Sequence, residues 1–381
     1  MRWPLSLAAF LAYFIMSGLL APIGLLVPAL AERFALSPVA VAASFSWLTG
    51  GVLIGSLIAL PLYRRIALRP VLAAVYVAMA LTLLLASRAA GLEALALTLG
   101  LAGTLSGMGL AGAALLISAL YRGDVRTSML VVTDACFSIA GYVVAPLTGW
   151  LITRELGGQQ VYLVLAVVSF FLCLLLVAPL PTITDTAEPA GDPSRPAPAT
   201  PFAFWLLAVS LCGYTFGQQT LLIWWPGEVL ADSGASSATV GTLIGRYWLG
   251  MFIAQLAVAI ALLRIATRWM LLAAAWGTSL GASLVLYASE LPASVRLLVW
   301  GIANLALLKV VLGFASAYLG GTHERTIPRL LFAATLGTAL APAGSAWFAQ
   351  VTGSALPMGF AALLLTALGI TSAVCVAKTD R

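Results

Sequence analysis

The chain has 381 residues, of which 62% are apolar and only 8% charged, and its mean hydropathy is +1.07. Soluble globular domains carry about 25% charged residues, so this composition excludes a cytosolic enzyme, a secreted protein and a nucleic-acid-binding protein, and it indicates a membrane protein. Because the formal net charge is nevertheless +6, the positive residues need an explanation other than nucleic acid.

Long apolar runs, interrupted by polar residues, glycine or proline, predict twelve membrane-spanning helices. The expected fold class is therefore an all-α membrane protein with two pseudo-symmetric bundles of six helices. In chain order, the predicted helices cover residues 5–30, 39–62, 71–87, 94–120, 128–152, 161–180, 202–224, 238–263, 269–288, 295–319, 328–349 and 357–377.

The basic residues predict the orientation of these helices, because cytoplasmic loops carry the excess of Lys and Arg. Thirteen basic residues fall on one side of the predicted membrane and four on the other, which places both termini and the central loop in the cytoplasm of a multi-pass inner-membrane protein. Membrane orientation thus explains the positive charge. The larger group is Arg2, Arg64, Arg65, Arg69, Arg122, Arg126, Arg195, Arg264, Arg268, Arg325, Arg329, Lys378 and Arg381, and the smaller is Arg33, Arg88, Arg154 and Arg296.

The chain divides into two halves of similar plan. Residues 181–201 contain six prolines and are typical of an extended cytoplasmic linker between an N-terminal bundle, 1–180, and a C-terminal bundle, 202–381. The Arg-Ile-Ala-Leu-Arg sequence at 65–69 recurs in related form at 264–268, six helices later. This duplication resembles the major facilitator superfamily, in which parallel repeats enclose a solute site near the bilayer midplane.

Three ionisable residues lie inside predicted helices: Asp134 in the fifth, Arg246 in the eighth and Lys309 in the tenth. Each costs roughly 2.5 to 3.5 kcal/mol near the centre of a spanning helix, so these residues should face protein or water. In the functional interpretation Asp134 exchanges protons, whereas Arg246 and Lys309 attract an anionic or zwitterionic solute. The alternative that the sequence leaves open is a structural ion pair between the halves.

Small residues at helical spacing support an inward direction for these charges. Around Asp134 they are Ser138, Gly141, Ala145 and Gly149, and around Lys309 they are Ala306, Gly313 and Ser316.

Neutral polar side chains complete the predicted solute site. They are Tyr13 in the first helix, Ser138 in the fifth, Gln218 in the seventh and Asn304 in the tenth. For each of them an interhelical hydrogen bond is the alternative interpretation. All four cysteines lie in predicted helices and the chain has one histidine, His323, so we expect no disulfide, no metal site and no cofactor.

The fifth helix, Thr133-Asp134-x-x-Phe137-Ser138-x-Ala140-Gly141, resembles that of TsgA-like transporters, which are related to fucose permeases. The resemblance implies a proton-coupled carrier of small polar solutes in the inner membrane. In fucose-permease-like proteins two amides on this helix are associated with sugar binding. Ala135 and Ser138 stand at those positions here, which argues against a sugar. The loop containing Arg64, Arg65 and Arg69, after Gly55, resembles the cytoplasmic latch of the superfamily without its acidic residue.

The predicted function is secondary active transport of a small polar solute, with symport of protons through Asp134. The alternatives are a proton-antiport exporter of a metabolite or drug, and a non-transporting sensor that keeps the carrier fold. The chain shows no nucleotide-binding signature and no clustered catalytic groups, so we do not expect an enzyme. The expected partners are the solute, protons and the lipid bilayer, with no nucleic acid, and the chain is expected to act as a monomer.

Overall fold

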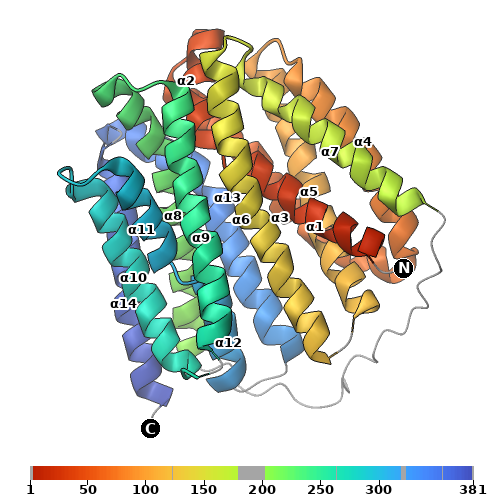
Figure 1. Cartoon of the computed structure of the whole chain (residues 1–381), viewed down its shortest axis with the longest axis vertical. Helices are drawn as coiled ribbons and strands as arrows, with labels where there is room; N and C mark the ends of the chain where they lie inside the picture. Colours follow the sequence, from red (N-terminus) through yellow and green to blue (C-terminus); the bar gives the residue numbers. More distant parts are fainter. Residues whose placement is uncertain are drawn as a thin grey trace. The chain divides into compact units, whose positions relative to one another are not determined.

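The computed structural model describes residues 3–121, 123–178, 202–262, 264–318, 323–353 and 355–379, and every element of regular structure in these ranges is a helix (Figure 1). The predicted linker, 181–201, lies outside the described residues. The helices are α1 (Trp3–Leu20), α2 (Ile23–Phe34), α3 (Pro38–Arg65), α4 (Leu68–Ser87), α5 (Leu92–Leu120), α6 (Gly123–Thr153), the 3-10 helix η1 (Gly158–Gln160), α7 (Val161–Val177), α8 (Phe202–Ser233), α9 (Ser237–Ala261), α10 (Thr267–Tyr287), α11 (Ala293–Ala303), α12 (Leu307–Tyr318), α13 (His323–Thr352) and α14 (Ala355–Thr379).

Within the described part of the chain, twelve helical spans are long and apolar enough to cross a membrane. This finding confirms the predicted number of spans and the all-α class. Their ends differ from the predicted ones by several residues in places. The seventh span, for example, was predicted to end at residue 224, whereas α8 continues past Pro226 to Ser233.

The first predicted span is not one helix, so the prediction of a continuous segment over 5–30 is wrong. α1 ends at Leu20 and α2 begins at Ile23. Pro22 lies between them, and its ring and missing N–H interrupt a helix. The carbonyl of Pro22 instead accepts hydrogen bonds from the N–H groups of Leu25 and Leu26, both at 3.0 Å, and so begins α2.

The tenth predicted span, 295–319, is also divided, and here the prediction of one helix is wrong for a different reason. α11 ends at Ala303 and α12 begins at Leu307, and Figure 1 shows them as separate ribbons. Leu305 and Ala306 have φ values of 46° and 51°, in the left-handed region that non-glycine residues rarely adopt. No proline or glycine marks this break in the sequence.

The chain forms two compact units. Unit 1 contains Met1–Arg195 and Ser236–Gly241, and unit 2 contains Pro196–Ala235 and Thr242–Arg381. The division therefore places the first residues of α9 with unit 1, where the backbone N–H of Ala238 donates to Thr153 Oγ1 at 3.0 Å.

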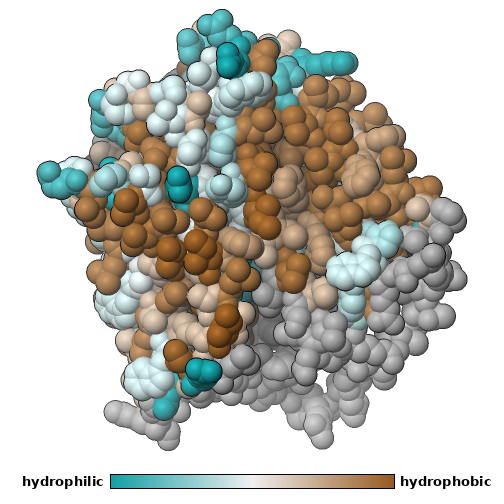
Figure 2. All heavy atoms as spheres, in the orientation of Figure 1, coloured by the Kyte–Doolittle hydropathy of each residue, from teal (hydrophilic) through white to brown (hydrophobic). Residues whose placement is uncertain are grey.

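Unit 1 is built around the packing of α3 against α5 and of α4 against α7. A methyl group at Gly55 of α3 would overlap the carbonyl of Thr104, and one at Gly103 of α5 would overlap the carbonyl of Leu48. Close backbone approach at small residues is the usual way in which spanning helices associate. On the outer side, Figure 2 shows mainly hydrophobic surface over α4 and α7, which suits contact with lipid chains.

Unit 2 is organised around α8, which packs against α13 and α14, and α14 in turn packs against α10. Polar side chains join these helices: Trp224 Nε1 donates to Ser345 Oγ at 2.9 Å, and Thr215 Oγ1 donates to the carbonyl of Ala334 at 2.7 Å. Such interhelical bonds satisfy polar groups that lipid cannot. The charged residues Arg246 and Lys309 lie on other helices of the unit, α9 and α12.

Candidate functional site

In unit 1 the predicted residues lie on two helices that pack together, α1 and α6. Asp134 is half-buried, with its Oδ2 atom out of contact with solvent, and Ser138 lies one turn further along α6 and is buried. Tyr13 of α1 is half-buried. All four small residues expected at helical spacing from Asp134 are buried, so α6 turns this side of the helix toward protein.

In unit 2 the amide of Gln218 is part of a buried polar and aromatic cluster. Its Nε2 donates to the phenol oxygen of Tyr247 at 2.5 Å, which joins α8 to α9. The ring of Tyr247 packs on that of Trp300 in α11, with centroids 4.4 Å apart. Gln218 therefore faces the interior of its own unit in this structure and positions an aromatic pair.

Asn304 has a comparable arrangement at the break between α11 and α12. Its Nδ2 donates to the phenol oxygen of Tyr214 at 2.8 Å, and its Oδ1 accepts from the backbone N–H of Leu307 at 3.3 Å. The first bond connects the break to α8, and the second caps the start of α12, whose first N–H groups lack partners within the helix. Asn304 is thus fixed at both ends of its amide.

The aromatic partners Tyr214, Tyr247 and Trp300 are the residues that sequence reasoning missed as members of this cluster. A signal was present: Tyr214 precedes Gln218 by four residues and Trp300 precedes Asn304 by four, the spacing that puts side chains on one face of a helix. All three aromatic side chains are buried. The two amides and three rings together define the amide–aromatic cluster of unit 2.

The amide–aromatic cluster is buried, whereas the two predicted cationic residues of unit 2, Arg246 and Lys309, are exposed on the surface of the unit. Arg246 lies on α9 with Thr242, one turn earlier, on the same exposed side. Lys309 is the third residue of α12 and is also exposed. The expected continuous helical face through Ala306 and Lys309 is wrong, because Ala306 lies in the break and not in a helix.

The predicted latch residues take two structural roles in unit 1. Gly55 permits the close approach of α3 and α5. Arg69 caps the carboxyl end of α7: its Nε donates to the carbonyl of Leu176 at 2.5 Å, and its Nη2 donates to the carbonyl of Ala178. The last carbonyls of a helix lack partners and carry partial negative charge, so a guanidinium is well suited to this position.

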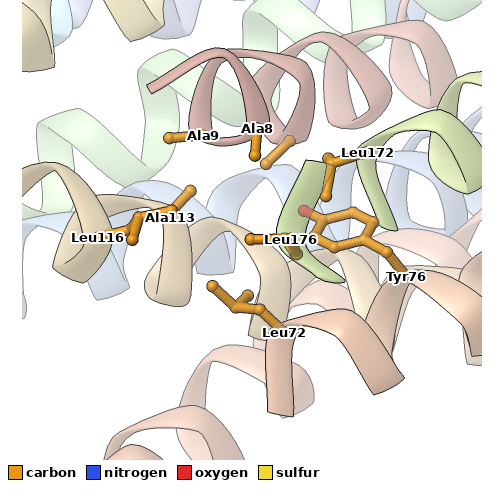
Figure 3. Close-up of a pocket in the computed structure, with 9 residues that line it drawn as sticks. Ala8, Ala9, Leu72, Tyr76, Ala113, Leu116, Leu172 and Leu176 are labelled. Atoms are coloured by element: carbon orange, nitrogen blue, oxygen red, sulfur yellow. The ribbon is translucent and has the colours of Figure 1, made fainter. Parts of the chain in front are cut away.

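A small pocket beside that cap is apolar and does not fit a polar solute. Figure 3 shows Tyr76 and leucine and alanine side chains of α1, α4, α5 and α7 around it, among them Leu72, Ala113 and Leu176. Its free volume of about 10 Å³ is close to the smallest space that holds one water molecule. The pocket is therefore a packing defect of unit 1 and is separate from the predicted site residues.

The amide–aromatic cluster yields a stability prediction. We expect Tyr247→Phe to destabilise the protein by about 1–3 kcal/mol, because it leaves the buried Gln218 amide without its acceptor while the ring still packs on Trp300. Thermal unfolding in detergent measures the effect, with the exposed Tyr287→Phe as the matched control. Adding Gln218→Met should restore most of the loss, since both polar partners are then removed, and a double variant less stable than Tyr247→Phe would contradict the assignment.

The fold and these residues together define the class: a multi-pass membrane protein of the transporter type, with two helical units and ionisable side chains placed within the spans. The family model of the Major Facilitator Superfamily matches residues 5–226. The chain belongs to this superfamily, as its duplicated six-helix plan predicted.

Comparison with curated proteins gives TsgA and its homologues. A TsgA homolog of Serratia proteamaculans is 24% identical over 380 residues, which cover 98% of this chain and 94% of the relative. A TsgA homolog of Citrobacter koseri is 26% identical over 382 residues, with the same coverage of both proteins. The resemblance inferred from the fifth helix is thereby confirmed over nearly the whole chain.

Two solved structures show the same fold at low sequence identity. A mutant of the nucleoside transporter NupG has a TM-score of 0.76 and 13% identity, and the match covers 98% of this chain and 99% of that one. A bacterial homolog of the human lysosomal transporter Spinster, inward-facing and unoccupied, has a TM-score of 0.73 and 16% identity, over 100% and 97% of the two chains. Both matches extend over nearly the whole chain, and they show that its fold is the one these two structures share.

Proposed function

We propose that this transporter moves a small anionic or zwitterionic solute across the inner membrane by alternating access, with proton coupling through Asp134. The protein works as a monomer with both termini in the cytoplasm, the orientation supported by the thirteen basic residues on one side. In a cycle of this kind the solute site opens first to one side of the membrane and then to the other.

One observation carries the proposal: Arg246 and Lys309 lie within spanning segments and yet on the surface of unit 2. A cation that faces lipid near the middle of the bilayer costs roughly 2.5 to 3.5 kcal/mol. Both residues are therefore expected to face a water-filled route rather than lipid. A positively charged surface along such a route attracts anionic groups. The acid of the set, Asp134, is on the other unit and supplies a group that can gain and lose a proton.

A thermal-shift screen of the purified protein tests the substrate class. Panels of carboxylates, phosphate esters, amino acids and neutral sugars are compared, and we expect anionic or zwitterionic compounds to raise the unfolding temperature. Lys309→Ala and Arg246→Ala should each weaken the binding of such a compound by about tenfold or more, the effect of losing roughly 1.4 kcal/mol.

The matched control is Arg264→Ala, because Arg264 is an exposed arginine in the turn after α9. This variant should bind the compound as tightly as the parent protein does. Stabilisation by neutral sugars alone, with equal affinity in all three variants, would overturn the proposed substrate class.

A further inference from the structure

The exposed side chains of α10 form one stripe along the helix. They are Trp269, Ala273, Trp276, Leu280 and Tyr287, whose spacings of three, four and seven residues put them on the same side. The two ends of the stripe are eighteen residues apart, or about 27 Å at 1.5 Å per residue, close to the thickness of the hydrocarbon core. Tryptophan and tyrosine are enriched at the two membrane–water interfaces. The stripe therefore faces lipid chains, and Trp269 marks the level of the lipid headgroups at its end.

Two arginines lie at the Trp269 end of this stripe. Arg264 is exposed in the turn between α9 and α10, and the guanidinium carbon of Arg268 is 5.4 Å from the centroid of the Trp269 ring, a cation–π distance. The sequence from 262 to 270 contains no acidic residue. Figure 2 shows hydrophilic atoms where α9 and α10 meet at the lower end of the view, below mainly hydrophobic surface. We call Arg264, Arg268 and Trp269 the arginine–tryptophan patch.

The related turn of unit 1 presents a different surface, although its sequence is similar. Arg65 is exposed there, as Arg264 is in unit 2. Arg69, however, donates its hydrogen bonds to carbonyls at the carboxyl end of α7. Pro70 follows it, at the position that corresponds to Trp269. The turn of unit 1 thus has a similar charge but lacks the aromatic ring at the interface.

We propose that the arginine–tryptophan patch binds the headgroup of an anionic phospholipid. Arg264 contacts the phosphate, Arg268 adds positive charge beside the indole ring, and an acyl chain lies along the exposed stripe of α10. Basic residues at this level are attracted to anionic lipids. Because the turn offers no carboxylate, nothing in it compensates the repulsion between the arginines and the ammonium group of a zwitterionic headgroup. The proposal does not depend on the solute, since the patch contains neither Arg246 nor Lys309.

Native mass spectrometry of the purified protein in detergent measures this binding, because each bound lipid adds its own mass. The protein is titrated with dioleoylphosphatidylglycerol, which is anionic, and with dioleoylphosphatidylcholine, which is zwitterionic and has the same acyl chains. We expect the first molecule of phosphatidylglycerol to bind about tenfold more tightly than the first phosphatidylcholine, since two basic residues favour it. Excess inorganic phosphate should not displace it, because phosphate lacks the acyl chains that contact α10.

Arg264→Ala should weaken the binding of phosphatidylglycerol by about fivefold, the ratio that corresponds to about 1 kcal/mol per basic residue at an anionic surface. Trp269→Leu should weaken it by about threefold, the range of an exposed cation–π contact. Neither variant should change the binding of phosphatidylcholine, and Arg264→Lys should retain most of the affinity. Both side chains are exposed, so we expect both variants to fold, and thermal unfolding checks this.

The matched control is Arg65→Ala, which removes the same charge from the related turn of unit 1 and should leave the affinity unchanged. Equal losses in Arg65→Ala and Arg264→Ala would show a general attraction of lipid to positive residues, without a site at α10. Equal affinities for the two lipids would likewise overturn the proposal. Displacement of phosphatidylglycerol by inorganic phosphate would show an anion site that does not recognise lipid, which also contradicts it.

Discussion

Asp134→Asn should abolish accumulation of the solute against its gradient while leaving exchange of solute across the membrane. Asparagine has nearly the same size as aspartate but does not take up and release a proton, so α6 keeps its packing and loses only the coupling group. In proteoliposomes with an imposed pH gradient, uptake by the variant should stop when the solute concentration inside equals that outside. Counterflow, in which internal unlabelled solute drives the entry of labelled solute, should persist.

Two controls separate coupling from general damage. Asp134→Glu keeps a carboxyl group and should retain part of the accumulation. Glu93→Gln removes an exposed carboxylate from the first turn of α5 and should leave accumulation unchanged. Full proton-driven accumulation by Asp134→Asn would refute the coupling role, and a carrier without proton coupling, or one that uses Lys309 as its switch, would replace it.

The length and composition of the apolar runs were sufficient to predict the twelve spans, because the hydrocarbon core of the bilayer has a fixed thickness and requires a fixed length of apolar helix to cross it. They were not sufficient to find where a span is interrupted. Pro22 carried a signal for the first break, since proline lacks the N–H of a continuing helix. The break after Ala303 carried none, because Leu305 and Ala306 are ordinary helix residues and their conformation depends on the tertiary contact between Asn304 and Tyr214.

The candidate site shows the same limit. Asp134, Arg246 and Lys309 were found because charge is costly in lipid and rare in spans. Gln218 and Asn304 were found for a similar reason, but their partners were not, because a tyrosine or tryptophan within an apolar helix is equally compatible with lipid contact and with the core. Only the fold shows that Tyr247 and Tyr214 accept the two amide hydrogen bonds.

Gly301→Ala should destabilise unit 2 by about 2 kcal/mol, a typical effect of an added methyl group where none fits. The carbonyl of Tyr247 and the N–H of Met251 occupy the space that the methyl would take, and both are backbone atoms that cannot rotate away. α9 and α11 would have to separate, which would also disturb the contact between Tyr247 and Trp300. Thermal unfolding in detergent, followed by tryptophan fluorescence, reports the change because the ring of Trp300 packs on that of Tyr247 at this contact.

Gly359→Ala is the matched control, since a Cβ at Gly359 of α14 meets nothing within 4 Å. This substitution should be neutral or stabilise the protein by about 0.5–1 kcal/mol, because alanine has a higher helix propensity than glycine. Equal unfolding temperatures for the two variants would mean that α11 is not held by direct backbone contact.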